Sequence, residues 1–145
     1  MSRKIAITLG KAKAKAELLD EDAPKTCDLV WNMLPIEGKT GHTIESGKEV
    51  FMNLDRKVKL VPENQTIHEI PGDVVIYFKQ TIPPPAASPR PVISFIYERD
   101  AQVRSLHGPV PVNLFARITD GLKEIGDEAV RMRREGYQNM RISRA

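Results

Sequence analysis

Apolar residues alternate with polar or small residues along much of the chain, a pattern typical of β-strands that bury one face. The alternation covers 5–9 and resumes over 12–18, on either side of the turn Gly10-Lys11. These two runs and their turn predict a β-hairpin. Further runs predict strands over 40–46, 49–54, 92–97 and 137–142, with 101–106 as a partner for 92–97.

The segment 74–78 differs because its residues, Val-Val-Ile-Tyr-Phe, are nearly all apolar. Its shortness and β-branched content indicate a strand buried on both faces. Pro71-Gly72-Asp73 comes directly before it, and we interpret Asp73 as a turn residue.

Two segments have the helical spacing of three and four instead. In the first, Ala23-Pro24 places a proline in the first turn, Asp22 is a candidate cap and Pro35 ends the pattern. Its apolar stripe consists of Cys27, Val30, Trp31 and Leu34. We expect the second helix to begin at Asn113 and to end at Gly136, with the stripe Phe115, Ile118, Leu122, Ile125, Ala129 and Met132.

This order of elements predicts a mainly β fold, a closed or half-open β-barrel with two helices, one near each end of the chain. A length of 145 residues suits one domain with a sizeable core, so we expect a single domain over residues 1–145.

The composition is ordinary for a soluble globular protein, with 41% apolar residues, 28% charged residues and a net charge of +3. No apolar run approaches the length of a membrane span, and the first residues lack the core of a signal peptide. We therefore expect a cytoplasmic protein without a membrane partner. Lys11, Lys13 and Lys15 line one face of the predicted hairpin without interleaved aromatic residues. They indicate a solvated face that discourages edge pairing, and no nucleic-acid partner is expected.

The single cysteine, Cys27, lies on the apolar face of the first helix, and we interpret it as a buried, inert thiol. The alternative is a nucleophile activated by the nearby helix start. His42, His68 and His107 do not have metal-site spacing, so no bound metal is expected. A Gly-rich dinucleotide fingerprint is absent as well, and we expect no cofactor.

Four short motifs carry a resemblance to a known family: Ala23-Pro24-x-Thr26-Cys27, Gly41-His42-x-Ile44-x-Ser46-Gly47, Pro62-Glu63-Asn64 and Pro71-Gly72-Asp73-Val74. Over 5–142 the chain resembles a bacterial family of uncharacterised proteins with a cyclophilin-like barrel. Cyclophilins proper carry an arginine, a glutamine and paired glycines where the stretch 41–52 has none of them. The resemblance therefore implies the fold without prolyl isomerase activity.

A second resemblance, in fold family and size, is to cucumopine synthase, a non-redox opine-forming enzyme. It implies condensation of histidine with 2-oxoglutarate by imine formation and ring closure, a Pictet–Spengler reaction. The partners would then be a small amino acid and a keto acid, whose carboxylates the 22 basic residues can hold. The alternative is a non-catalytic cyclophilin-like binding module that takes a peptide or a small ligand.

For such an enzyme the candidate acid–base residues are His42, Glu45 and Tyr77. His42 or Glu45 would be the base, and Tyr77 a hydroxyl donor. His42 and Glu45 lie three apart in one predicted strand, so their side chains face opposite ways. The alternative for His42 is a hydrogen-bonded structural histidine.

Four further residues are candidates for substrate binding. Lys79 and Arg99 each share a strand face with a tyrosine and could clamp carboxylates, although an exposed strand-end arginine is the alternative for Arg99. Glu63 and Asn64 lie in a polar loop between strands, where site residues are common.

The sequence also favours a homo-oligomer. The apolar stripe of the second helix is long for a chain of this size, and the lysine-faced hairpin protects one sheet edge. Oligomers can bring loops of neighbouring chains together into one site.

Overall fold

The computed structural model describes residues 2–78, 90–105 and 107–145, so the candidate clamp Lys79 lies outside the described residues. The helices are α1 (Pro24–Met33) and α2 (Leu122–Glu135). The strands of the first half are β1 (Lys4–Leu9), β2 (Ala12–Leu18), β3 (Ile36–Lys39), β4 (Gly41–His42), β5 (Glu49–Asn53), β6 (Gln65–Thr66) and β7 (Asp73–Phe78). Those of the second half are β8 (Pro91–Ile96), β9 (Arg104–Ser105), β10 (Gly108–Pro109), β11 (Val112–Asp120) and β12 (Asn139–Arg144).

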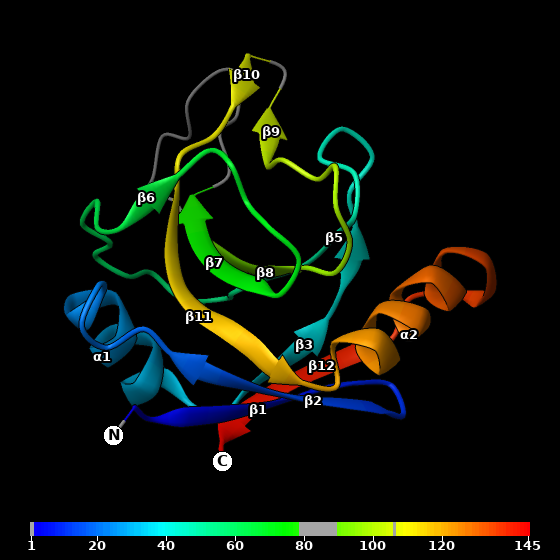
Figure 1. The fold of residues 1–145 in the computed structure, drawn as a ribbon, viewed down its shortest axis with the longest axis horizontal. Helices are drawn as coiled ribbons and strands as arrows, with labels where there is room; N and C mark the ends of the chain where they lie inside the picture. The colour runs from blue at the N-terminus through cyan, green and yellow to red at the C-terminus, as the bar shows by residue number, and fades with distance from the viewer. Residues whose placement is uncertain (1, 79–89, 106) are drawn as a thin grey trace.

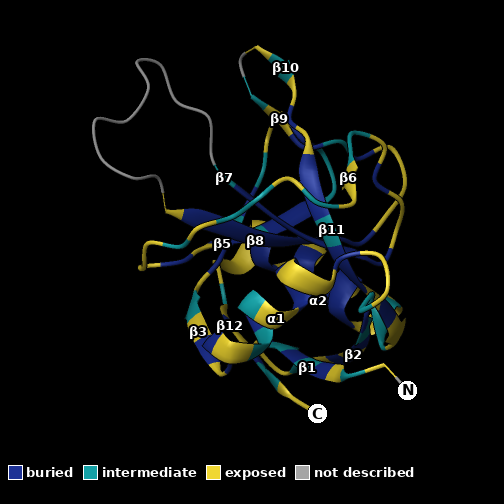
Figure 2. Cartoon of the chain, turned by 90° about the vertical axis from the view of Figure 1, so that its left-hand side faces the viewer, coloured by how far each residue is buried: buried dark blue, intermediate teal, exposed yellow. Residues whose placement is uncertain are grey.

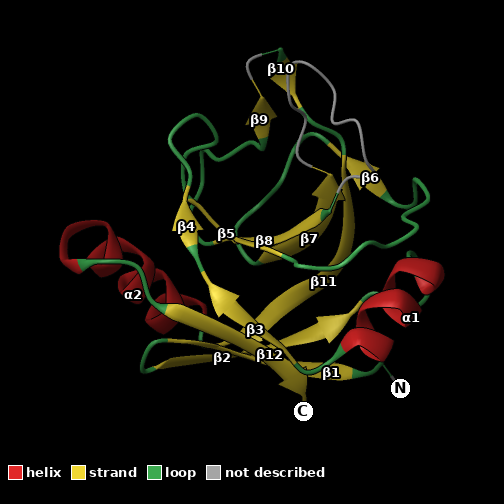
Figure 3. Ribbon diagram, turned by 180° about the vertical axis from the view of Figure 1, so that it is seen from behind, coloured by secondary structure: helices red, strands yellow, loops and turns green. Residues whose placement is uncertain are grey.

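The main sheet curls into a nearly closed barrel, because its two end strands are consecutive parts of one stretch of chain (Figures 1 and 3). The strand order is β3-β12-β1-β2-β11-β7-β8-β5-β4, and only Thr40 separates β3 from β4. Both the backbone N–H and the hydroxyl of Thr40 donate to the carbonyl of Gln138, which holds the chain at this junction. The predicted β-barrel with two helices is confirmed.

The N-terminal hairpin forms as predicted, with Ile7 opposite Ala14. Alanines of β2 face the core, while Lys13 and Lys15 are exposed. However, β2 lies between β1 and β11, so the expectation that these lysines protect a sheet edge is wrong. A solvated face explains them without that role.

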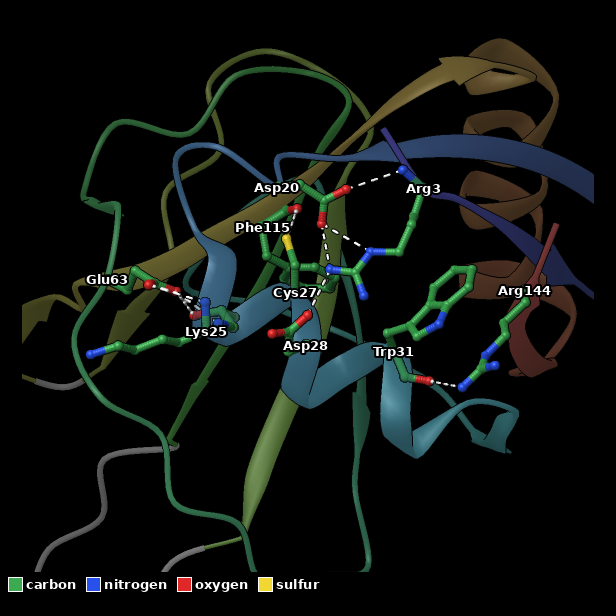
Figure 4. A network of polar contacts seen from close by, with 10 residues as sticks. Arg3, Asp20, Lys25, Cys27, Asp28, Trp31, Glu63, Phe115 and Arg144 are labelled. Carbon is green, nitrogen blue, oxygen red and sulfur yellow. Dashed lines mark hydrogen bonds and ion pairs between the residues drawn. The ribbon is translucent and has the colours of Figure 1, made fainter. Parts of the chain in front are cut away.

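Helix α1 begins at Pro24 as the sequence indicated, but Asp22 does not cap it. The cap position is Ala23, which makes no side-chain hydrogen bond. Instead, the carboxylate of Glu63 accepts hydrogen bonds from the backbone N–H groups of Lys25 and Thr26, at 3.2 and 2.7 Å (Figure 4). A side chain from a distant loop therefore satisfies the first turn of the helix.

Cys27 is fully buried in α1, and its thiol donates to the backbone carbonyl of Phe115 at 3.3 Å. Burial raises the pKa of the Cys27 thiol to about 12. Because the thiolate is the reactive form, this confirms the interpretation of Cys27 as an inert thiol.

The second helix begins at Leu122, and the expected start at Asn113 is wrong because residues 112–120 form β11. The register of β11 against β7 shifts between Leu114 and Ala116, so that Phe115 is an extra residue. The bulge lets Phe115 and Ile118 both face the core, and their spacing of three resembles a helical stripe. Gly121 separates strand and helix with φ of 82°, and a Cβ there would collide with the backbone of Lys13.

Two strand assignments also change. The predicted strand 40–46 ends at His42, and residues 44–48 form a bend. The neighbours of β8 are β5 and β7, so the expected pairing of 101–106 with 92–97 is wrong for the described residues 101–105. Instead, β9 pairs with β10 in a separate two-stranded sheet. Figure 1 shows this small hairpin above β7 and β8. The homo-oligomer stays a prediction, but both reasons for it are lost. Helix α2 buries its apolar stripe in the core, and the lysine-bearing strand β2 is not a sheet edge.

Both faces of β7 are buried, as predicted, and they contribute to different cores (Figure 2). Val74 and Ile76 face the barrel interior, which residues of both helices also fill. Val75 and Tyr77 face outward and pack in a second cluster with Val92, Val103, Val110 and Val112. No helix in the described ranges is long and apolar enough to cross a membrane.

Candidate functional site

The outer face of the barrel wall carries buried polar side chains from three neighbouring strands. Glu49 comes from β5, Tyr77 from β7 and Ser94 from β8, and the ladder places Ser94 directly opposite Val75 and Phe51. The Tyr77 hydroxyl donates a hydrogen bond to Glu49 Oε2 at 2.8 Å. Residues that alternate along paired strands thus converge on one carboxylate.

Loops from three parts of the chain cover this face and add a second carboxylate, Glu69. Gln102 connects two of these loops, since its backbone N–H donates to the carbonyl of Ser46 and its side chain donates to that of Ile67. The backbone N–H of Arg104 donates to the Ser46 hydroxyl at 3.0 Å. We call Glu49, Glu69, Tyr77 and Ser94 the carboxylate cluster.

The cluster is buried but incompletely hydrogen-bonded. Glu49 is 0% exposed, and Glu69 and Tyr77 are each 8% exposed. Glu49 Oε1, both carboxylate oxygens of Glu69 and Ser94 Oγ have no hydrogen-bond partner among the residues that the structure describes. A buried polar group without a partner costs about 1–3 kcal/mol, so folded proteins rarely keep one without a reason.

Burial also changes the protonation of the cluster. It raises the pKa of Glu49, and the nearby hydroxyls of Ser94, Tyr77 and Ser46 counter only part of that rise. Among the described residues, only the Tyr77 hydroxyl meets the geometry of a hydrogen bond to this carboxylate. Burial, with a smaller contribution from the charges of Glu49 and Asp73, raises the pKa of Glu69 to about 7. Backbone N–H groups of Glu69 and Val103 lie near the carboxylate and oppose the rise, but they do not meet hydrogen-bond geometry. Burial and the neighbouring Glu49 raise the pKa of Tyr77 as well.

This arrangement can move protons near neutral pH. A carboxyl group whose pKa is close to the working pH can both accept and give up a proton, which is what a general acid or base does. Tyr77 holds Oε2 of Glu49 in place, while Oε1 has no partner in the part of the chain that the structure describes. Perturbed carboxylates of this kind gather at functional sites, although ion-pair networks perturb pKa values too.

Of the predicted acid–base residues, only Tyr77 joins this cluster. His42 is buried elsewhere, with Nδ1 2.8 Å from the carbonyl of Thr43 and Nε2 2.6 Å from the hydroxyl of Tyr97. Because a carbonyl only accepts, Nδ1 carries the proton and Nε2 accepts from Tyr97. Burial lowers the pKa of His42, and both nitrogens are occupied, as in a structural histidine.

Glu45 is exposed in the bend 44–48, three residues beyond the end of β4. The argument that His42 and Glu45 occupy opposite faces of one strand is therefore wrong, because that strand stops at His42. Arg99 is likewise exposed beyond the end of β8 at Ile96, so it does not share a strand face with Tyr97.

Glu63 and Asn64 both hold loops to the barrel. Burial by itself raises the pKa of Glu63, but hydrogen bonds from Thr26 and Lys25 outweigh it and the pKa is lowered. The Asn64 side chain donates to the carbonyl of Leu114 at 2.9 Å, and its φ of 46° is left-handed. Asp73 closes a turn as predicted, since its carboxylate accepts from the backbone N–H of Ile70 at 2.9 Å.

Glu49, Glu69 and Ser94 were not predicted as site residues from the sequence. Glu49 does carry a signal, since it begins a predicted strand directly before the apolar Val50, and a fully buried carboxylate is unusual. Glu69 carries none, because it lies in an irregular loop and meets Glu49 only through tertiary structure. Among the described residues, no three or more His, Cys, Asp or Glu side chains are placed to hold a metal ion.

Solved structures with a similar fold include McbB in complex with tryptophan, with a TM-score of 0.68 and 16% identity over 97% of this chain and 44% of that one. The chain thus spans less than half the length of McbB. The hypothetical protein AF2241 from Archaeoglobus fulgidus gives 0.60 and 22% identity, covering 99% of this chain and 95% of its own. The Mimivirus cyclophilin has a TM-score of 0.53 and 11% sequence identity, and the match covers 99% of this chain and 87% of the cyclophilin.

These likenesses show that the fold is cyclophilin-like, and at such identities they show the fold alone. A comparison with curated proteins gave no match. The family model described as "Protein of unknown function (DUF3830)" matches residues 5–144, and the chain belongs to that family.

Proposed function

We propose that this protein is a non-redox enzyme that uses the carboxylate cluster for acid–base chemistry on a small amino-acid-derived substrate. The observation that carries the proposal is the pair of buried glutamates, Glu49 and Glu69, with three carboxylate oxygens that lack partners among the described residues. A cluster with only a packing role would gain nothing from these groups, since apolar residues of similar size cost less to bury.

The concrete form of the proposal is a condensation of an amino acid with a keto acid, of the cucumopine type. The amine nitrogen bonds to the keto carbon, water leaves, and an imine forms. A ring carbon of the amino acid then bonds to the former keto carbon, and the same ring carbon gives up its proton. The product is the sum of both reactants minus one water.

Each of these steps needs a proton donor or acceptor, and the cluster offers both. Glu69, with a pKa of about 7, would supply the proton that departs with water. Glu49, held through Oε2 by Tyr77, would accept the ring proton on Oε1. Further support comes from McbB, which has a similar fold and was solved with an amino acid, tryptophan, bound.

The test is to incubate the protein with histidine and 2-oxoglutarate, and separately with tryptophan and 2-oxoglutarate, and to follow the condensed product by mass spectrometry. Glu49→Gln preserves shape but cannot accept the proton, and we expect it to lower the rate by about 10²–10⁴-fold. The matched control is Glu21→Gln, which makes the same change at an exposed glutamate before α1, outside the cluster.

Two results would contradict the proposal. If His42→Gln abolishes turnover while Glu49→Gln does not, the base belongs to the histidine and not to the cluster. If no pair of amine and keto acid is consumed while one of these compounds still raises the melting temperature, the protein is a binding module.

A further inference from the structure

The unpartnered oxygens of the carboxylate cluster define what kind of group can occupy it. Glu49 Oε1 and both oxygens of Glu69 are acceptors, and they belong to side chains that are at least nine-tenths buried. Ionised carboxylates only accept hydrogen bonds, so a group that satisfies them must be a donor. One of these acceptors comes from β5 and two come from the loop before β7, and the charge of Glu49 acts on Glu69. Three acceptors suit a group with several N–H donors.

The charge around these oxygens is negative. The groups that act on Glu69 are Glu49 from β5, Asp73 from β7 and backbone N–H groups, and Glu69 in turn acts on Tyr77 of β7. The Nε of Arg117 pairs with Asp73 at 3.2 Å. Within the described parts of the chain, no lysine or arginine forms an ion pair with Glu49 or Glu69.

A metal ion does not suit this place. Two carboxylates are fewer ligands than a calcium or zinc ion takes from a protein, and no larger group of possible ligands occurs in the described ranges. An organic cation, in contrast, needs only donors that point at the free acceptors. A primary ammonium group has three such donors and one positive charge.

We propose that the carboxylate cluster binds the ammonium group of a primary amine, with donors directed at Glu49 Oε1 and at the Glu69 carboxylate. The inference rests on the proposed function for the identity of the rest of the substrate, but the ammonium preference holds for binding alone. The cluster thus selects amines over neutral molecules of the same shape, and it places the reactive nitrogen beside the acid–base pair.

Binding of a cation also shifts the proton on Glu69. The free carboxyl is partly protonated at neutral pH, because its pKa is about 7 and because Glu49, Asp73 and Tyr77 face it without a compensating positive charge among the described residues. A bound ammonium favours the ionised form, so binding releases a proton. Affinity therefore rises between pH 6 and pH 8, before the amine itself loses its charge.

The experiment compares two matched pairs of probes by calorimetry: tryptamine against tryptophol, and histamine against 4-(2-hydroxyethyl)imidazole. Each pair differs only in an ammonium or a hydroxyl group. We expect at least one amine to bind about tenfold or more tightly than its alcohol, since hydrogen bonds between charged groups are stronger than those of a neutral hydroxyl. The preference should disappear in the double variant Glu49→Gln, Glu69→Gln and persist in Glu21→Gln.

Proton release is measured on the unmodified protein, in buffers of different ionisation heat, so it does not depend on how well the variant folds. Equal affinity for amine and alcohol, no binding of either amine at millimolar concentration, or binding without proton release would each overturn the inference. Amine binding without condensation would refute the proposed function and leave the inference intact. Condensation without an amine preference would do the reverse.

Discussion

The two faces of the barrel wall formed by β5, β7 and β8 are equally buried but very different in chemistry. The interior face is apolar, and Ile76, Ile93 and Phe95 belong to the main core, to which both helices also contribute. The outer face mixes valines with Glu49 and Ser94 under a cover of loops. Consecutive residues of one strand thus serve two purposes, since one face stabilises the fold and the other holds polar groups away from water.

The difference is sharpest in the hydrogen bonds. Four buried side-chain atoms lack a partner among the described residues, and all of them belong to Glu49, Glu69 and Ser94 on the outer side. Burial of apolar surface stabilises by about 25 cal/mol per Å², whereas each unpartnered polar group costs about 1–3 kcal/mol. The polar groups of the outer face therefore lower the free energy of unfolding, which is expected of a surface arranged for a ligand.

The largest expected effect on stability comes from truncating the interior face. Ile76→Ala removes a fully buried side chain from the main core, and we expect unfolding by urea to show a loss of about 2–5 kcal/mol. Ser94→Ala on the opposite face removes a hydroxyl without a partner and should be neutral or slightly stabilising. A loss from Ser94→Ala that equals the loss from Ile76→Ala would break the distinction between the faces.

The next effect is the dependence of stability on pH. The pKa of Glu69 rises from its ordinary 4.5 to about 7 on folding, so between these values the folded state holds a proton that the unfolded state has lost. The free energy of unfolding therefore falls as the pH rises through this window, by an amount on the order of 3 kcal/mol. Glu69→Gln should remove this decline.

The measurement is the difference in the free energy of unfolding between the wild type and Glu69→Gln, obtained by urea unfolding at each pH. His42 acts in the opposite sense, because its pKa is lowered by burial and its contribution to stability is lost as the pH falls through about 6.5. Glu49 has a raised pKa and adds to the decline. A difference that does not change between pH 5 and pH 8 would mean that Glu69 is not held in an apolar environment.

Sequence patterns predicted the elements whose signal is local. The N-terminal hairpin, the proline start of α1, the double burial of β7 and the inert Cys27 all depend on neighbouring residues, and all are confirmed. The start of α2 was wrong because a bulge in β11 places Phe115 and Ile118 on one face at helical spacing. Periodicity cannot distinguish such a bulged strand from the first turns of a helix.

The candidate site was harder to predict than the fold. Tyr77 was identified from its strand, but its partner Glu49 comes from another strand and Glu69 from an irregular loop, and no sequence spacing relates the three. Glu63 and Asn64 were candidates for substrate binding because they lie in a polar loop, but in the structure their side chains make hydrogen bonds that hold loops to the barrel. Only the arrangement in space distinguishes a carboxylate with partners from one without.

Glu63 is a carboxylate with hydrogen-bond partners, so a substitution there tests the contrast with Glu69, with a smaller expected effect on stability. It accepts three hydrogen bonds near the start of α1, two of them at 2.7 Å from the N–H and the hydroxyl of Thr26. Glu63→Ala should lower the free energy of unfolding at pH 7 by about 1 kcal/mol, as the loss of a helix cap does. Because its pKa is lowered, its contribution is lost as the pH falls below the ordinary value, opposite in sense to Glu69. An unchanged stability of Glu63→Ala at pH 7 would mean that the capping contacts contribute nothing.

The smallest effect is expected at the surface, where Trp31 of α1 lies between two arginines (Figure 4). The guanidinium groups of Arg144 and Arg3 are 4.6 and 5.3 Å from the centre of the indole ring. Arg144 Nη2 also donates to the carbonyl of Trp31 at 3.0 Å, so it connects the end of β12 to α1. These contacts are partly solvated, and polar contacts in water contribute little compared with the buried faces of the wall.

Arg144→Ala should therefore cost about 0.5–1 kcal/mol, the usual contribution of an exposed cation–π contact. Trp31 is the only tryptophan of the chain, so its fluorescence reports this place alone, and its emission should change in the variant. Arg56→Ala, which removes the same charge from an exposed loop, is the control and should leave the emission unchanged. A loss from Arg144→Ala as large as that from Ile76→Ala would show that the connection between β12 and α1 matters as much as the interior, and that stability is not concentrated on one face of the wall.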